Sequence, residues 1–271
     1  MRIAWFVCAV VGIGCHSSMG KNLADADGTL DGEPASAEDL ASFVAPHIGT
    51  GGSGWFEGDT FAGATFPLGM MQWSPDTATN PAGGYDYADT TIKGFSLTHF
   101  SGRGCQVYQD FLFMPFVGVV TGSPASNSAT TRSTFSHANE VATAGYYKVL
   151  LDGPKVITEL TVTARTGVGR FTYPPSTTAT LLLDAGASIN GTSASSIALA
   201  GDQRHLSGSA TSVIGCGSQP YTIYFAAEID QTPTNVSIFD GPRSLSAPST
   251  PAVRMWESPS YSTRVPRTRC R

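Results

Sequence analysis

The stretch Val156-Ile-Thr-Glu-Leu-Thr-Val-Thr-Ala164 decides the fold class, because apolar and polar residues alternate along it. Successive side chains of an extended chain point to opposite faces, so this spacing gathers the apolar residues on one face. The other face carries Glu159, Thr161 and Thr163. The pattern therefore predicts a β-strand with one face buried.

Five further segments show the same alternation, and turn-forming residues separate them. The segments are residues 146–151, 168–173, 179–184, 205–213 and 221–229. Glycine and proline, which favour tight turns, occur in Asp152-Gly153-Pro154, Pro174-Pro175 and Gly215-Cys216-Gly217. Because no helical periodicity intervenes, we predict an all-β fold, an antiparallel β-sandwich over about residues 43–238. Only residues 37–44 are expected to hold a helical turn.

Composition supports this fold class and excludes one class of partner. The chain has 271 residues, of which 41% are hydrophobic and 14% charged, and this balance is typical of a globular protein. Its 30 glycines and 17 prolines disfavour long helices. The net charge is −5, although five arginines lie in residues 254–271. The rest of the chain is therefore more acidic still, and we expect no nucleic-acid partner.

The N-terminus has the pattern of an export signal. Arg2 precedes an apolar run over residues 3–13, which is too short to span a bilayer. Gly14-Cys15 follows, as in bacterial lipoprotein signals, although Gly12 stands where such signals usually have leucine. We predict a signal peptide at residues 1–14, with Cys15 lipidated or with ordinary cleavage nearby. The protein would then be a bacterial cell-envelope lipoprotein, or periplasmic or extracellular, and its only membrane contact would be the lipid anchor.

The sequence after the signal predicts a linker and leaves two states open for its cysteines. Residues 15–42 are rich in Asp, Ala, Gly and Ser, which is typical of a flexible linker. Beyond the signal the chain keeps Cys105, Cys216 and Cys270, without zinc-binding spacing. A disulfide between Cys105 and Cys216 and two buried free thiols are both compatible with the sequence.

A glycine- and aromatic-rich segment carries a family resemblance. The segment contains five motifs, which are Ile48-Gly-Thr-Gly-Gly52 and residues 61–77, 84–89, 92–105 and 110–115. In sequence and in order, these motifs resemble the N-terminal domain of glycoside hydrolase family 92. Further similarity extends to about residue 238. Members of this family are exported, exo-acting α-mannosidases. Their N-terminal domain is a supersandwich-like β-domain joined to a larger helical domain.

The resemblance also implies where catalysis takes place. These enzymes use a calcium-dependent inverting mechanism, which needs a carboxylic acid and a second carboxylate that activates water. In the family both belong to the helical domain, whereas here only 30 residues follow Gly241. We therefore expect a sandwich domain at residues 43–241 and an irregular tail at 242–271. The tail would result from truncation or a shifted reading frame, or it would be a genuine solvated tail. No catalytic residue, metal or other cofactor is expected in this chain, and calcium would belong to the complete enzyme.

These observations lead to one main functional hypothesis and two alternatives. The chain would be the carbohydrate-binding N-terminal part of an exported α-mannosidase acting on mannose-containing glycans, and it would be inactive without its missing helical partner domain. The first alternative is a free-standing carbohydrate-binding module of the same fold. The second is a truncated product without function. Differences from the family's usual motifs, such as the absence of His from residues 53–60, leave the preferred linkage open.

Five residues of the glycine-rich motifs are candidates for sugar binding. His99 is expected either to donate to a sugar hydroxyl or to be a hydrogen-bonded core residue. Asp89 is expected to accept from a hydroxyl pair or to cap a turn. Tyr85 and Trp55, like the neighbouring Tyr87, would stack on a sugar ring or pack in the core. Arg103, exposed between two glycines, would bind sugar or form a surface ion pair.

Overall fold

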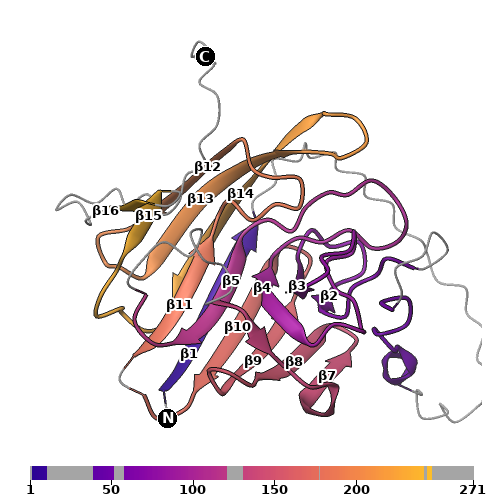
Figure 1. Cartoon of the computed structure of the whole chain (residues 1–271), viewed down its shortest axis with the longest axis horizontal. Coiled ribbons are helices and arrows are strands. Elements are labelled where there is room, and N and C mark those ends of the chain that lie inside the picture. Colours follow the sequence, from indigo (N-terminus) through magenta and orange to yellow (C-terminus); the bar gives the residue numbers. More distant parts are fainter. Residues whose placement is uncertain are drawn as a thin grey trace, which may run out of the picture.

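The computed structural model describes residues 2–10, 39–51, 58–120, 131–176, 178–240 and 243–245. Two antiparallel sheets lie face to face over one shared core (Figure 1). In these ranges there is no α-helix, only short 3-10 turns such as Leu40–Phe43 and His137–Asn139. Nor do they contain a helix that is both long and apolar enough to cross a lipid bilayer.

The larger sheet has eight strands. Their order is β12 (Ala194–Leu199), β13 (His205–Val213), β14 (Pro220–Ile229), β1 (Arg2–Val10), β10 (Thr166–Tyr173), β9 (Val156–Val162), β8 (Tyr146–Leu151) and β7 (Glu140–Thr143). Strands β7 to β10 follow one another along the chain, and so do β12 to β14. The sheet thus consists of two meanders with β1 between them (Figure 1).

The second sheet supplies the opposite layer. Its order is β11 (Ala179–Asp184), β5 (Leu112–Val117), β4 (Thr91–Ser96), β3 (Gln72–Thr77) and β2 (Ala64–Thr65), with β6 (Ser133–Thr134) paired to β4. A separate pair joins β15 (Ile238–Asp240) to β16 (Arg243–Leu245). The long connections between β2, β3, β4 and β5 gather beyond the sheet edge, on the right in Figure 1.

The predicted all-β sandwich is confirmed. All six segments with alternating patterns form strands, and every strand pair in the two large sheets is antiparallel. In β10 burial alternates residue by residue, and the inward side chains include Phe171 and Tyr173. The predicted helical turn near residue 40 is the 3-10 turn Leu40–Phe43.

The N-terminal segment is part of the larger sheet. Residues 2–10, which carry the apolar run of the predicted signal peptide, form strand β1 in the uncleaved chain. The structure does not test whether this segment is removed, so the signal peptide stays a prediction. Cys15 and most of the predicted linker lie outside the described residues, as does the tail after residue 245.

Trp73 is at the centre of the core between the two sheets. Its side chain is fully buried, and its indole Nε1 donates to the Phe95 carbonyl oxygen at 3.2 Å. The ring packs against β10 where that strand carries Gly167 and Gly169. A Cβ at Gly169 would lie 2.6 Å from the ring, so glycine is what allows the indole to approach the strand.

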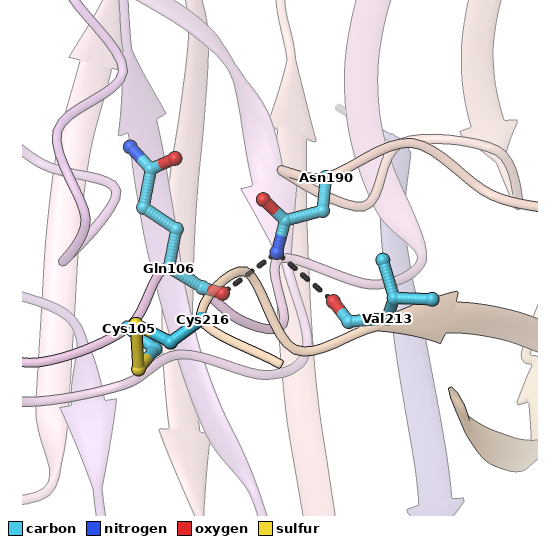
Figure 2. Close-up of a disulfide and its surroundings, with 5 residues drawn as sticks. All are labelled: Cys105, Gln106, Asn190, Val213 and Cys216. Carbon is cyan, nitrogen blue, oxygen red and sulfur yellow. Dashed lines mark hydrogen bonds between the residues drawn. A yellow bond between two sulfur atoms is a disulfide. The ribbon is translucent and has the colours of Figure 1, made fainter. Parts of the chain in front are cut away.

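A disulfide joins the two layers at one end. Cys105, in the loop before β5, is bonded to Cys216, in the turn between β13 and β14 (Figure 2). Of the two possibilities that the sequence left open, the disulfide is therefore the one observed. Beside it, Asn190 Nδ2 donates to the carbonyl oxygens of Gln106 at 2.6 Å and Val213 at 2.9 Å (Figure 2). Three loops are thereby held together.

Candidate functional site

The glycine-rich loops assemble into one layer beside β3 and β4. We call residues 47–51, 58–63, 79–89 and 97–111 the loop cluster. Its segments are tied by backbone hydrogen bonds, since Tyr87 N donates to Thr50 O at 2.9 Å and Gly102 N donates to Asp59 O at 3.0 Å. At Gly83 a Cβ would lie 2.6 Å from Asp59 O, so the close approach of these loops requires glycine.

A buried carboxylate, Glu140, lies at the base of the loop cluster. Its side chain is 1% exposed. Both carboxylate oxygens accept from the Tyr85 hydroxyl at 3.0 Å, and Oε1 also accepts from the Tyr147 hydroxyl at 2.6 Å. Burial, reinforced by the adjacent carboxylate, raises the pKa of both tyrosines, so both hydroxyls remain donors. These bonds fix the position of Tyr85 relative to strands β7 and β8.

His137 connects Glu140 to the exposed part of the cluster. His137 Nε2 lies 2.7 Å from the Tyr87 carbonyl oxygen, which can only accept, so Nε2 carries a proton. His137 Nδ1 lies 2.6 Å from Glu140 Oε2. His47 Nε2 is 3.4 Å from the same Oε2. Although His47 lies close, its Nε2 makes no hydrogen bond to the protein, so the carboxylate organises two tyrosines and His137.

Tyr87 presents an aromatic surface to solvent above these groups. Its ring is parallel to that of His137, with centroids 3.9 Å apart, and meets the His47 ring edge-on at 5.3 Å. Tyr87 is still 44% exposed. An aromatic ring fixed in this way offers a flat apolar face, the kind of surface that complements the C–H face of a sugar ring.

The four described candidates from the sequence occupy different environments. Tyr85 and His99 are each 1% exposed, whereas Asp89 is half-buried and Arg103 is exposed. Trp55 lies outside the described residues. A role in sugar binding stays a prediction for all five.

His99 is held on both ring nitrogens by the protein. Nδ1 donates to the Gln72 carbonyl oxygen at 2.7 Å, because a carbonyl can only accept. Nε2 lies 3.1 Å from Asp76 Oδ1 and 3.2 Å from Ser96 Oγ. A Cβ at Gly84 would lie 2.7 Å from the ring, so the tight turn at Gly84 packs directly on it. In this structure His99 joins β3, β4 and the loop cluster.

Asp89 and Arg103 also have protein partners. Asp89 Oδ2 accepts from both the backbone N and the hydroxyl of Thr79, each at 2.8 Å, and thereby links the two ends of the 79–89 loop. Arg103 Nη1 donates to Asp59 Oδ2 at 2.8 Å. Both keep solvent-facing atoms, so each can also reach an external ligand.

A second buried carboxylate, Asp110, supports the strained end of the loop cluster. It is fully buried and accepts from the Thr98 hydroxyl at 2.9 Å and the Tyr221 hydroxyl at 3.3 Å. Burial raises the pKa of Asp110 to about 6. Adjacent Gln109 and Phe111 have φ of 64° and 57°, a region that non-glycine residues rarely adopt. The hydrogen bonds to Asp110 help to hold this backbone.

Sequence reasoning named Tyr85 and Tyr87 but missed the groups that organise them. His47 comes from a segment far from His137 and Glu140 in the chain, and none of the three belongs to a recognisable motif. The alternation in β8 was the one available signal, because it places Tyr147 on the buried face. Among the described residues no three His, Cys, Asp or Glu side chains converge as a metal site would require.

Comparison with known proteins identifies the family. The model of the glycosyl hydrolase family 92 N-terminal domain matches residues 43–260. A family GH92 α-mannosidase from Bacteroides thetaiotaomicron is similar in structure, with 31% identity over 83% of this chain and a TM-score of 0.70. The same α-mannosidase in complex with mannoimidazole gives 31% identity over 82% of this chain and a TM-score of 0.70.

A third structure, the GH92 family glycosyl hydrolase ccman5, is 29% identical over 69% of this chain, with a TM-score of 0.63. The chain spans only 30%, 29% and 26% of these three proteins. No protein with a curated description matches it. Because the family model covers most of the sequence, this chain belongs to the glycosyl hydrolase family 92 N-terminal domain family.

Proposed function

We propose that this chain is the carbohydrate-binding N-terminal part of an exported α-mannosidase, and that it does not release mannose by itself. The observation that carries the proposal is the similarity to a GH92 α-mannosidase that binds mannoimidazole, combined with coverage of only about 30% of that protein. The remainder of such an enzyme would supply the catalytic carboxylates and any calcium.

The chemistry of the loop cluster favours binding over turnover. An inverting glycosidase needs two carboxyl groups roughly 6.5–9.5 Å apart that face a substrate and a water. Here the carboxylates of Glu140, Asp76 and Asp110 are buried, and each accepts at least one hydrogen bond from the protein. Oδ2 of Asp76 has no hydrogen-bond partner, but it is buried and does not face solvent. Asp59 is paired with Arg103. The exposed ring of Tyr87, by contrast, is free to take up an apolar sugar face.

The test combines activity with binding. We expect the full chain to release no mannose from α-mannosides and to bind α-methyl mannoside weakly, as measured by NMR titration. Tyr87→Ala should lower that affinity about fivefold, because a stacking contact is worth about 1 kcal/mol. The matched control is Tyr224→Ala, since Tyr224 is 58% exposed on β14, outside the loop cluster.

Two outcomes would change the proposal. Mannose release that disappears on substitution of a carboxylate within the chain would contradict it. Tight mannoside binding by the isolated chain would instead favour the free-standing binding module.

Export and lipidation belong to the same proposal. They rest on the apolar run after Arg2 and on Gly14-Cys15. Mass spectrometry of the protein from a bacterial host should find a diacylglyceryl-modified Cys15 as the new N-terminus. An unmodified N-terminus cut near residue 15 would leave export standing without the anchor, and an intact Met1 would contradict both.

A further inference from the structure

The outward face of strands β12, β13 and β14 contains a hollow of about 510 Å³. Ser207 pairs with Ala198 on one side and with Ala226 on the other, so the three side chains share one face of the sheet. All three residues are exposed. Two positions along the strands, His205 is paired with Glu228 on the same face. Small side chains therefore form the floor of the hollow, and His205 and Glu228 form one rim.

The floor is apolar although it faces away from the core. Outward positions of an antiparallel sheet are ordinarily polar, whereas Ala198, Ala200 and Ala226 are exposed alanines that line the hollow. Leu199 and Leu206, which alternate with the outward residues, are buried. Because the outward side chains are so short, the hollow offers a strip of apolar surface on which an aliphatic chain can lie.

The imidazole at the rim is held in one tautomer. His205 Nδ1 lies 2.5 Å from Asp202 Oδ2. Hydrogen bonds from the backbone N–H of Arg204 and from His205 lower the pKa of Asp202 to about 2, so this carboxylate is ionised and accepts from Nδ1–H. Neutral His205 therefore presents Nε2 as an acceptor. This Nε2 lies 3.9 Å from Glu228 Oε2.

The other acceptor at the rim is also held in place. Arg204 Nη2 donates to Glu228 Oε1 at 2.7 Å, and Arg204 Nε donates to the Ile229 carbonyl oxygen at 2.9 Å. Oε2 is left facing His205. Two acceptors cannot bond to each other, but a nitrogen with two N–H groups fits between them at about 2.8 Å from each. A hydroxyl has one proton and could donate to only one of them. A cationic donor gains further from the ionised carboxylate.

We propose that this hollow binds a primary alkylammonium ion, the chemistry of a lysine side chain. The ammonium donates to Glu228 Oε2 and His205 Nε2, and the methylene chain lies on Ala226 and Ala198. The site shares no residue with the loop cluster and does not depend on mannose.

An NMR titration of the full chain with n-pentylammonium chloride tests the proposal, with the Cε1–H signal of His205 as the reporter. We expect a saturable shift with a dissociation constant on the order of 1 mM. Glu228→Gln should weaken binding about tenfold, because a charge-assisted hydrogen bond is lost. The matched control is Glu159→Gln, since Glu159 pairs with Arg170 in the same sheet but does not line the hollow. This control should bind as wild type.

Further probes separate the head of the ligand from its chain. n-Pentanol has the chain without the charge, and tetramethylammonium has the charge without an N–H, so neither should give a saturable shift. Ala226→Leu fills the floor but keeps both acceptors, and it should weaken pentylammonium binding about tenfold. Nα-acetyl-lysinamide distinguishes two sources of the same chemistry. Affinity equal to that of pentylammonium assigns a lysine of a polypeptide, and weaker binding assigns a small amine.

The proposal also predicts a pH dependence. Protonated His205 has no acceptor nitrogen and would itself donate to Glu228. The other charged groups around it are Asp202 and Arg204, while residues 198–200 of β12 are uncharged. Affinity for pentylammonium should therefore decrease about fivefold from pH 8 to pH 5.5, the range in which histidines titrate.

Several results would overturn the proposal. They are the absence of a saturable shift, wild-type affinity in Glu228→Gln or Ala226→Leu, equal binding of tetramethylammonium, and an affinity that does not change with pH. None of these measurements uses mannose, so failure here would leave the proposed function untouched.

Discussion

At the scale of single residues, Glu140 shows how one buried carboxylate holds the site together. It accepts from two tyrosine hydroxyls and lies within hydrogen-bond distance of His137. Glu140→Ala would leave the buried hydroxyls of Tyr85 and Tyr147 without an acceptor, so we expect a loss of about 3–5 kcal/mol in the free energy of unfolding. Urea denaturation of the variant and of the wild-type chain measures this loss.

The control for this substitution is another glutamate of the same sheet. Glu228 is 46% exposed at its pair with Arg204, so Glu228→Ala should cost less than about 1 kcal/mol. Equal losses for the two variants would contradict the organising role of Glu140.

The raised pKa of Asp110 predicts an unusual pH dependence of the stability of the fold. Its folded pKa is raised to about 6, above that of an unfolded aspartate, so between pH 4 and 6 the folded state holds the proton more tightly. The contribution of Asp110 to the free energy of unfolding therefore decreases by about 3 kcal/mol as pH rises across this window. Burial raises the pKa of Asp184 to about 6 as well, and adds to this slope.

Asp110→Asn should reduce the slope of unfolding free energy between pH 4 and 6, as measured by urea titrations at several pH values. A hydrogen bond from the backbone N–H of Arg204 lowers the pKa of exposed Asp202 to about 2. Asp202→Asn should therefore leave the slope in this window unchanged. An unaltered slope in Asp110→Asn would count against the buried-acid explanation.

At the scale of elements, the fit of β10 against the core depends on its glycines. A Cβ at Gly169 would lie 2.6 Å from Trp73, whose ring is fully buried and cannot move away. We expect Gly169→Ala to destabilise the fold by about 1–3 kcal/mol, the usual cost of overpacking. Gly201→Ala is the control, because no atom lies within 4 Å of its Cβ. Equal thermal midpoints for the two variants would refute this account of β10.

The same elements explain how far the sequence could predict the structure. Strands with one face outward, such as β9 and β10, have a period of two and were predicted. Strand β3 has no such period because nearly all of its residues are buried, and β5 contains Pro115, so neither was predicted.

At the candidate site, motifs in the sequence pointed to Tyr85 and Tyr87. Contacts to Glu140 join residues 55 positions apart, and no local pattern encodes them.

At the scale of the whole molecule, the Cys105–Cys216 disulfide is the covalent link between the two layers. It connects a loop of the β3–β4–β5 sheet to the β13–β14 turn of the other sheet, across 111 residues of sequence. Closing so long a loop restricts the unfolded chain, and this is worth about 4–5 kcal/mol in the chain-entropy model. We expect a double Cys105→Ser, Cys216→Ser variant to lose most of that stability.

The same disulfide also anchors the loop cluster, because Cys105 lies within residues 97–111. The double variant should therefore bind mannoside less well even where it is fully folded, since the loop loses its fixed end. Its thermal midpoint should not respond to reductant, whereas that of the wild-type chain should decrease on reduction to the value of the variant. Cys270→Ser, which leaves the disulfide intact, should behave as wild type in both assays. If reduction left the wild-type midpoint unchanged, the two sheets would be held by their shared core alone, and the loop cluster would not depend on this link.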